Sequence, residues 1–228
     1  AALIGEKDLI RDGPKVKAKE ISGALGVLLL SSLAVAMVLN VSPLTVELLA
    51  ESNQKEEPGK FFNALLIARI PLFFFQAIQA ALLPRLSQLV ASEEFRKFRH
   101  ETMRLLVFIS VFGVCFLALM AFSGQWLTRL AFGSQYEISR QDMFLLAVSS
   151  VGLMYALSMT QGLLALHRQG LSATAWIVGI ATFPATIFLG EDLFLRVEIA
   201  LITTVFITTS LLGFFLTKSY KTQKVNPT

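Results

Sequence analysis

The sequence is poor in the residues on which most catalytic and metal sites depend. Its 228 residues include one cysteine, Cys115, and two histidines, His100 and His167. A single cysteine excludes an intrachain disulfide, and a thiol inside an apolar run is usually inert. The sequence also lacks a HExxH zinc pattern, a Gly-x-Ser-x-Gly nucleophile turn and a phosphate-binding glycine loop. We therefore expect no catalytic residue, no metal and no cofactor, and we do not expect an enzyme.

Charged residues are also scarce. They make up 16% of the chain, whereas 54% of the residues are hydrophobic and the mean hydropathy is +0.65. The apolar residues come in blocks of about 20, which is the length of a helix that crosses a bilayer. Strands of a membrane barrel would instead be about ten residues long and would alternate apolar with polar positions. The sequence therefore predicts an all-α integral membrane protein.

Hydropathy windows of about 19 residues predict six transmembrane helices. Their ranges are 21–50, 61–83, 105–122, 143–166, 171–189 and 197–217. These helices would form one transmembrane lobe over 21–217, between an N-terminal segment at 1–20 and a tail at 218–228. Pro43, Pro71 and Pro184 lie inside predicted helices, and we expect kinks there because proline cannot donate a backbone hydrogen bond. The chain opens on Ala1 rather than methionine, and we expect further sequence upstream.

The basic residues predict the orientation of the helices. Fourteen of the 20 Lys and Arg residues fall in the N-terminal segment, the second and fourth connections and the tail, and five fall in the other connections. Positive residues favour the cytoplasmic side, so both termini are predicted to be cytoplasmic in a multi-pass protein of the cytoplasmic membrane. Basic residues beside membrane ends meet anionic lipid headgroups. Membrane lipids are therefore expected partners, and nucleic acid is not.

The remaining basic residue, Arg69, lies inside the second predicted span. It is about 12 Å along that helix from Phe61 at 1.5 Å per residue. A central arginine costs roughly 2.5 to 3.5 kcal/mol on an insertion scale, so it usually faces a partner or a water-filled cavity. Gln76 lies two turns further on the same face and Gln79 lies close to that face. Arg69 is therefore either a cavity residue that meets a ligand or a structural residue bound to a helix carbonyl or to Glu47.

Glu47 has two interpretations of its own. As a residue at membrane depth it would be a counter-ion or a coupling-ion site. It lies, however, one turn from the outer end of the first predicted span, where it would simply be at the membrane interface. The sequence favours the interface.

Three stretches of the sequence are familiar in their order and spacing: "FFNALLIARIPLFFFQAIQAALLPRLSQL", "LAFGSQY" and "SVGLMYALSMTQGLLALHRQG". Together they resemble the second six-helix lobe of polysaccharide and oligosaccharide flippases in the multidrug/oligosaccharidyl-lipid/polysaccharide exporter superfamily. In that family two six-helix lobes enclose a central cavity, and alternating access moves a lipid-linked sugar across the bilayer. This chain would supply one lobe, and the other lobe would come from upstream sequence or from a dimer partner.

The resemblance implies a set of cavity-lining residues in this chain. They would be Arg69, Gln76, Gln79 and Asn40, and Asn40 lies in the region where family members often carry an acidic residue. Arg69 would meet the diphosphate of a polyprenyl-linked glycan, because a guanidinium group binds such oxygens in a bidentate manner. The alternative function is a scaffold or assembly partner of a cell-envelope polysaccharide system that does not itself transport.

Overall fold

The computed structural model describes residues 18–225, and within this range it confirms the all-α fold. The elements are α1 (Ala18–Leu49), α2 (Glu57–Ala68), α3 (Ile70–Ala91), α4 (Phe95–Phe132), the 3₁₀ helix η2 (Ser134–Tyr136), α5 (Arg140–Ala165), α6 (Gln169–Thr186) and α7 (Leu193–Val225). The described residues include no strand. Most of the predicted N-terminal segment and the last three residues of the tail lie outside the described residues.

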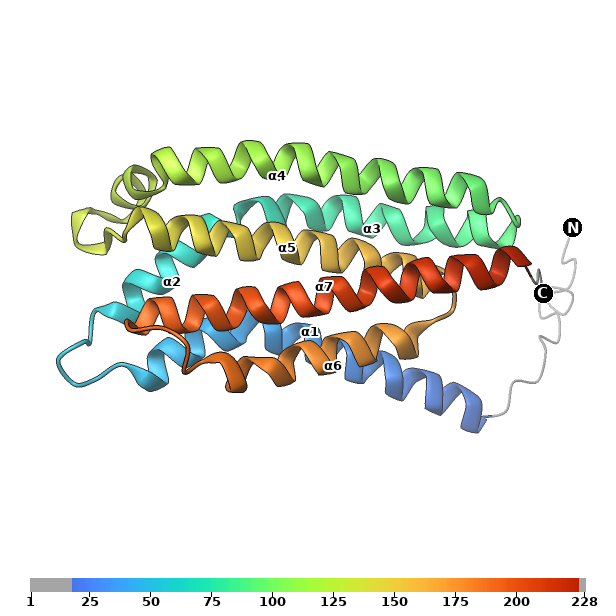
Figure 1. Ribbon diagram of the computed structural model, residues 1–228, viewed down its shortest axis with the longest axis horizontal. Coiled ribbons are helices and arrows are strands. Elements are labelled where there is room, and N and C mark those ends of the chain that lie inside the picture. The colour runs from blue at the N-terminus through green and yellow to red at the C-terminus, as the bar shows by residue number, and fades with distance from the viewer. Residues whose placement is uncertain (1–17, 226–228) are drawn as a thin grey trace, which may run out of the picture.

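The helices lie side by side along one long axis (Figure 1). The beginning of α1 and the end of α7 lie at the same end of the bundle, which we call the termini end. The opposite end, which we call the loop end, carries the α1–α2, α4–α5 and α6–α7 connections.

Five helices are long and apolar enough to cross a membrane. They are Leu25–Leu49, Ile70–Ala91, Phe95–Phe132, Arg140–Ala165 and Leu193–Thr222. The fifth predicted span, 171–189, corresponds to α6, which has only 18 residues and contains serine and several threonines. It is not among the five. The structure therefore confirms that several helices are long and apolar enough to span a membrane. That the chain crosses the membrane six times stays a prediction.

Helix α5 forms the centre of the bundle. It packs against α2, α3, α4 and α7. Within its apolar stretch of 18 residues 67% is buried inside the bundle, whereas only 22% is buried in the corresponding stretches of α1, α3 and α4. Glycines allow its neighbours to approach closely: a Cβ at Gly152 of α5 would lie 2.5 Å from a methyl group of Val205 on α7. Small residues at helix contacts are the usual means of tight association in a membrane, where apolar burial alone gives no driving force.

The second predicted span differs most from the structure. The sequence predicts one helix over 61–83, but α2 and α3 are separate helices with Arg69 between them. Pro71, which has no N–H group, lies in the first turn of α3, the position where proline is best tolerated. By contrast, α1 and α6 run through Pro43 and Pro184 without interruption.

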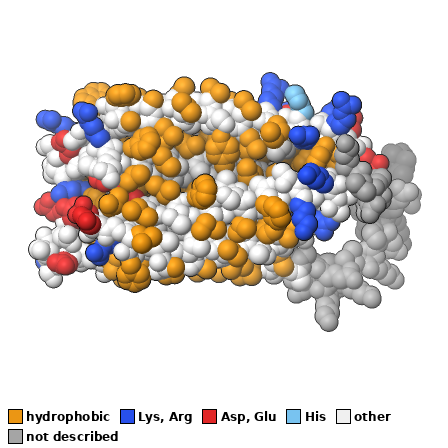
Figure 2. All heavy atoms as spheres, in the orientation of Figure 1, with side chains coloured by type: hydrophobic (Ala, Val, Ile, Leu, Met, Phe, Trp, Pro, Cys, Tyr) orange, Lys and Arg blue, Asp and Glu red, His pale blue; other side chains and the backbone are white. Residues whose placement is uncertain are grey.

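The surface is divided into an apolar band and two polar ends. Figure 2 shows hydrophobic side chains along the middle of the bundle, and Lys and Arg side chains gathered near the termini end. Acidic side chains gather at the loop end in the same view. The pattern agrees with helices that cross a membrane, whereas the side on which the termini lie stays a prediction.

Candidate functional site

A groove with a volume of about 540 Å³ lies between α1, α3 and α5. Two of the predicted cavity residues, Gln76 and Gln79, line it, and α5 adds Gln161. We call it the glutamine groove. Its other lining residues are apolar: Val35, Leu39, Leu72, Ala80, Leu83, Pro84 and Leu157.

The three glutamines lie at different depths in this groove. Gln76 is exposed, Gln79 is half-buried and Gln161 is only 9% exposed. Each amide offers two hydrogen-bond donors and an acceptor oxygen. The groove therefore combines polar groups that can bind hydroxyls with apolar walls that can hold a hydrocarbon.

Arg69 lies outside the lining of the groove but close to it in the chain. It is one helical turn before Leu72, which lines the groove, and it is half-buried. Its Nε and Nη2 atoms are buried and have no hydrogen-bond partner among the described residues. Glu47, one of the two structural partners suggested by the sequence, is exposed and forms no ion pair with Arg69. The ligand role of Arg69 stays a prediction.

The remaining cavity candidate, Asn40, lies on the exposed surface of α1. Its Nδ2 group donates a hydrogen bond of 2.8 Å to the carbonyl oxygen of Ala36 in the same helix. The structure does not place Asn40 among the residues that line the glutamine groove. The roles predicted for Asn40 and Glu47 stay predictions.

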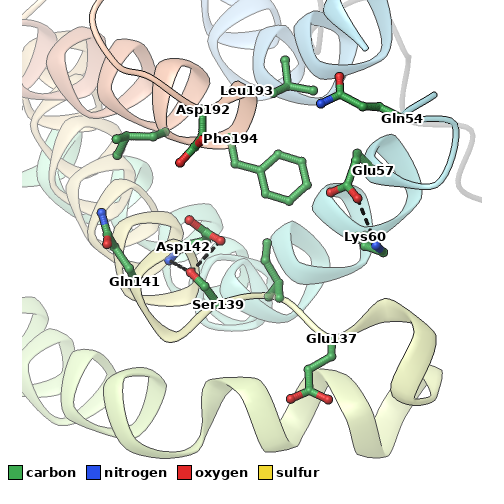
Figure 3. A pocket seen from close by; sticks show the side chains of 12 residues that line it. Gln54, Glu57, Lys60, Glu137, Ser139, Gln141, Asp142, Asp192, Leu193 and Phe194 are labelled. Carbon is green, nitrogen blue, oxygen red and sulfur yellow. Dashed lines mark hydrogen bonds and ion pairs between the residues drawn. The ribbon is translucent and has the colours of Figure 1, made fainter. Parts of the chain in front are cut away.

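A second polar site opens at the loop end (Figure 3). It is a pocket of about 550 Å³, which we call the acidic pocket. The side chains in Figure 3 come from α2, α5 and the start of α7, and from the connections that precede these three helices. The lining residues are Gln54, Glu57, Lys60, Glu137, Ile138, Ser139, Gln141, Asp142, Asp192, Leu193, Phe194 and Leu195.

Two of the four carboxylates in this pocket, those of Glu57 and Glu137, interact with a lysine and a glutamine. Lys60 Nζ lies 2.9 Å from Glu57 Oε1, and Gln125 Nε2 donates to Glu137 Oε1 at 2.7 Å. Four carboxylates face one amine, so the pocket attracts cations.

Asp142 is held by the cap of α5. Ser139 accepts a hydrogen bond from the Asp142 backbone N–H at 3.1 Å, and its hydroxyl donates to Asp142 Oδ2 at 2.6 Å. This is the usual arrangement at a helix N-terminus, where a serine oxygen satisfies an unpaired N–H group. The cap fixes the direction of the Asp142 carboxylate.

The structure places Gln161 in the lining of the glutamine groove and Glu198 one helical turn from residues that line the acidic pocket, and neither residue was predicted from the sequence. Glu198 lies on α7 with 1% of its surface exposed, and neither of its carboxylate oxygens has a hydrogen-bond partner among the described residues. Both residues are polar positions inside predicted spans, and that signal was available in the sequence. In the described part of the chain, no group of three or more His, Cys, Asp or Glu side chains is arranged to hold a metal ion.

Comparison of the chain with protein-family models, with curated proteins and with solved structures found no match. The class of the protein therefore rests on its fold and composition. An all-α bundle with five apolar helices of sufficient length is the fold of a helical membrane protein.

Proposed function

We propose that the chain is one lobe of a membrane transporter of the multidrug/oligosaccharidyl-lipid/polysaccharide exporter type. In this proposal it moves lipid-linked oligosaccharide or polysaccharide precursors across the cytoplasmic membrane by alternating access. The glutamine groove forms one wall of the passage, and a second six-helix lobe forms the other wall. Both termini face the cytoplasm.

The observation that carries this proposal is the glutamine groove itself. A lipid-linked glycan has a sugar part rich in hydroxyl groups and a long hydrocarbon part, and the groove presents amides beside apolar side chains. A polar residue inside a membrane segment is costly unless it faces a partner, a cavity or a water-filled path. Three glutamines from two helices that converge on one groove are best explained by a polar ligand that passes there.

Arg69 supports the same substrate class. Its Nε and Nη2 groups are buried and unpaired among the described residues, so a ligand that brings oxygen atoms to them meets no competing protein group. Guanidinium binds phosphate oxygens in a bidentate way and keeps its charge when buried. The diphosphate between lipid and glycan is the part of the substrate that fits this residue.

The position of the groove at the surface of the bundle requires a second wall. Helices α1 and α3 border the groove, and only 22% of the apolar 18-residue stretch of each helix is buried within this lobe. A second lobe against α1 and α3 would close the groove and turn it into a passage. Upstream sequence or a second copy of the chain would supply that lobe.

The test is a flipping assay with the protein in vesicles that contain a fluorescent polyprenyl-diphosphate glycan. The variants are Gln76→Leu and Gln161→Leu, and the matched control is Gln88→Leu, an exposed glutamine on α3 outside the groove. We expect a fall of about tenfold in flipping per folded molecule for each groove variant, because each loses about one hydrogen bond of roughly 1 kcal/mol or more. The Gln88→Leu rate should stay close to that of the unchanged protein.

The scaffold alternative gives a different result. A protein that does not transport would show no flipping above that of empty vesicles, whatever residue occupies the groove. Equal flipping in Gln76→Leu, Gln161→Leu and Gln88→Leu would also overturn the role of the groove.

A further inference from the structure

Glu198 is the most completely buried ionisable side chain for which the structure shows no partner. It is 1% exposed, and both oxygens lack a hydrogen-bond donor among the described residues. An ionised carboxylate in such a place would cost several kcal/mol, so a buried acid without a donor takes up a proton or binds a cation. Glu198 therefore needs a ligand that the described residues do not supply.

The acidic pocket lies between Glu198 and the solvent at the loop end, so a proton or cation could reach Glu198 through it. Glu198 lies one turn of α7 beyond Phe194 and Leu195, which line the pocket. Helix α7 packs against α5, which carries Asp142, another residue that lines the pocket. Ser139 donates a hydrogen bond to Asp142 Oδ2, which leaves Oδ1 available to a further donor.

Acidic side chains predominate around Glu198. Helix α5 contributes Asp142, and the α6–α7 connection contributes Glu191 and Asp192. Helix α6 carries no ionisable side chain, and at this end α1 carries only Glu47, which is exposed. Of the basic side chains at this end, Lys60 of α2 pairs with Glu57, Arg196 Nε donates to the carbonyl oxygen of Gly190 at 3.1 Å, and Arg140 at the start of α5 is exposed.

We propose that Glu198 and Asp142 form a proton-binding carboxyl pair that exchanges its proton with water through the acidic pocket. One protonated carboxyl donates its O–H group to an oxygen of the other, which supplies the donor that Glu198 lacks. Uptake adds one proton to a carboxylate oxygen, and release returns it to pocket water, with no other bond made or broken. A proton suits the site because the described residues offer no third carboxylate, histidine or cysteine in the arrangement that a metal ion needs. This inference does not rest on the proposed transport function.

The first test is infrared spectroscopy of the purified full chain at neutral pH. We expect a carbonyl band of a protonated carboxylic acid that shifts in deuterium oxide. The band should be lost in Glu198→Gln and kept in Glu137→Gln, the matched control, because Glu137 lines the same pocket but accepts a hydrogen bond from Gln125. Absence of the band from the unchanged protein, or its persistence in Glu198→Gln, would overturn the proposal.

A second variant keeps the test decisive where Glu198→Gln does not fold. In Asp142→Asn the Glu198 proton remains, but its acceptor changes from a carboxylate to an amide, so the band should move to a different frequency. A band at an unchanged frequency would show that the two groups do not share the proton.

The third measurement separates a proton from a metal cation. The melting temperature of the unchanged protein is compared in sodium and in choline salts of equal ionic strength, across a range of pH. We expect the melting temperature to fall as the pH rises, equally in both salts, and this dependence to be lost in Glu198→Gln. A higher melting temperature in sodium alone, lost in Glu198→Gln, would assign the site to a metal cation and overturn the proton assignment.

Discussion

Arg69 and Glu198 are buried ionisable side chains of opposite charge in one bundle, and they do not meet. Each has polar atoms without a hydrogen-bond partner among the described residues. Arg69 lies at the break between α2 and α3, whereas Glu198 lies inside α7 beneath the acidic pocket. A direct ion pair would have satisfied both groups, but the fold keeps them apart.

The chemistry of the two groups explains why they call for different ligands. A guanidinium group does not lose its proton in a protein, so the charge of Arg69 has to be met by an anion or by water. A carboxyl group becomes neutral by taking up a proton, so Glu198 can be accommodated without a counter-ion. The same lack of a partner therefore indicates anion binding at one site and proton binding at the other.

The largest expected effect is at Arg69. We expect Arg69→Ala to lower flipping per folded molecule about a hundredfold or more, because two charge-assisted hydrogen bonds to the diphosphate are lost at roughly 1.5 to 3 kcal/mol each. Arg69→Lys should retain part of the activity, since it keeps the charge but loses the planar fork. Transport in vesicles, normalised to the amount of folded protein, measures both.

Arg85 provides the matched control for this prediction. It lies on α3, the helix that begins directly after Arg69, is exposed and forms an ion pair of 2.7 Å with Glu101. Exposed ion pairs contribute about 1 kcal/mol at most, so Arg85→Ala should leave flipping nearly unchanged. If Arg69→Ala instead lowered the amount of folded protein and left flipping per molecule normal, Arg69 would be a structural residue.

A smaller effect is expected when the buried acid is replaced by an apolar side chain of similar size. Glu198→Leu should stabilise the folded protein by about 1 to 3 kcal/mol, because a buried polar group without a full set of hydrogen bonds is removed. The gain should increase with pH. Chemical unfolding in detergent at several pH values measures it.

The corresponding control is Glu137→Leu at the rim of the pocket. It loses the 2.7 Å hydrogen bond from Gln125 and should therefore bring no gain in stability. A loss of stability in Glu198→Leu equal to that in Glu137→Leu would mean that the hydrogen bond shared with Asp142 stabilises the folded protein by more than burial of the carboxyl group costs.

The smallest effect is expected at Pro71. Pro71→Ala restores a backbone N–H group in the first turn of α3, which would allow α2 and α3 to join across Arg69. We expect only a modest change in the amount of folded protein, but a several-fold loss of flipping as Arg69 moves relative to the groove. Reduced protein with unchanged flipping per molecule would show that the break matters for folding alone.

The sequence predicts the outline of this fold well because each membrane-spanning helix satisfies its own backbone. Long apolar runs therefore indicated helices without any knowledge of their contacts. The partition of the second predicted span into α2 and α3 was missed, since Pro71 suggests a kink but does not show that the helix ends at Ala68.

The candidate sites were predicted only in part, for a reason that also lies in tertiary contacts. Gln76 and Gln79 share a predicted span with Arg69, so their grouping follows from helical spacing. Gln161 joins them from α5, 82 positions after Gln79, and no periodicity connects the two. Likewise, an acid at the start of a predicted span suggests the membrane interface, and only the packing of α7 against α5 shows that Glu198 is enclosed.

The close contact between α6 and α7 fixes their register. A Cβ at Gly179 would collide with the hydroxyl of Thr208. At this contact α6 therefore has a glycine, which has no side chain, opposite Thr208 of α7. Sliding α6 by one turn would bring Ala175 or Phe183 opposite Thr208, and neither side chain fits there. A slide of α6 along α7 by one turn would therefore require the Thr208 side chain or α7 itself to move.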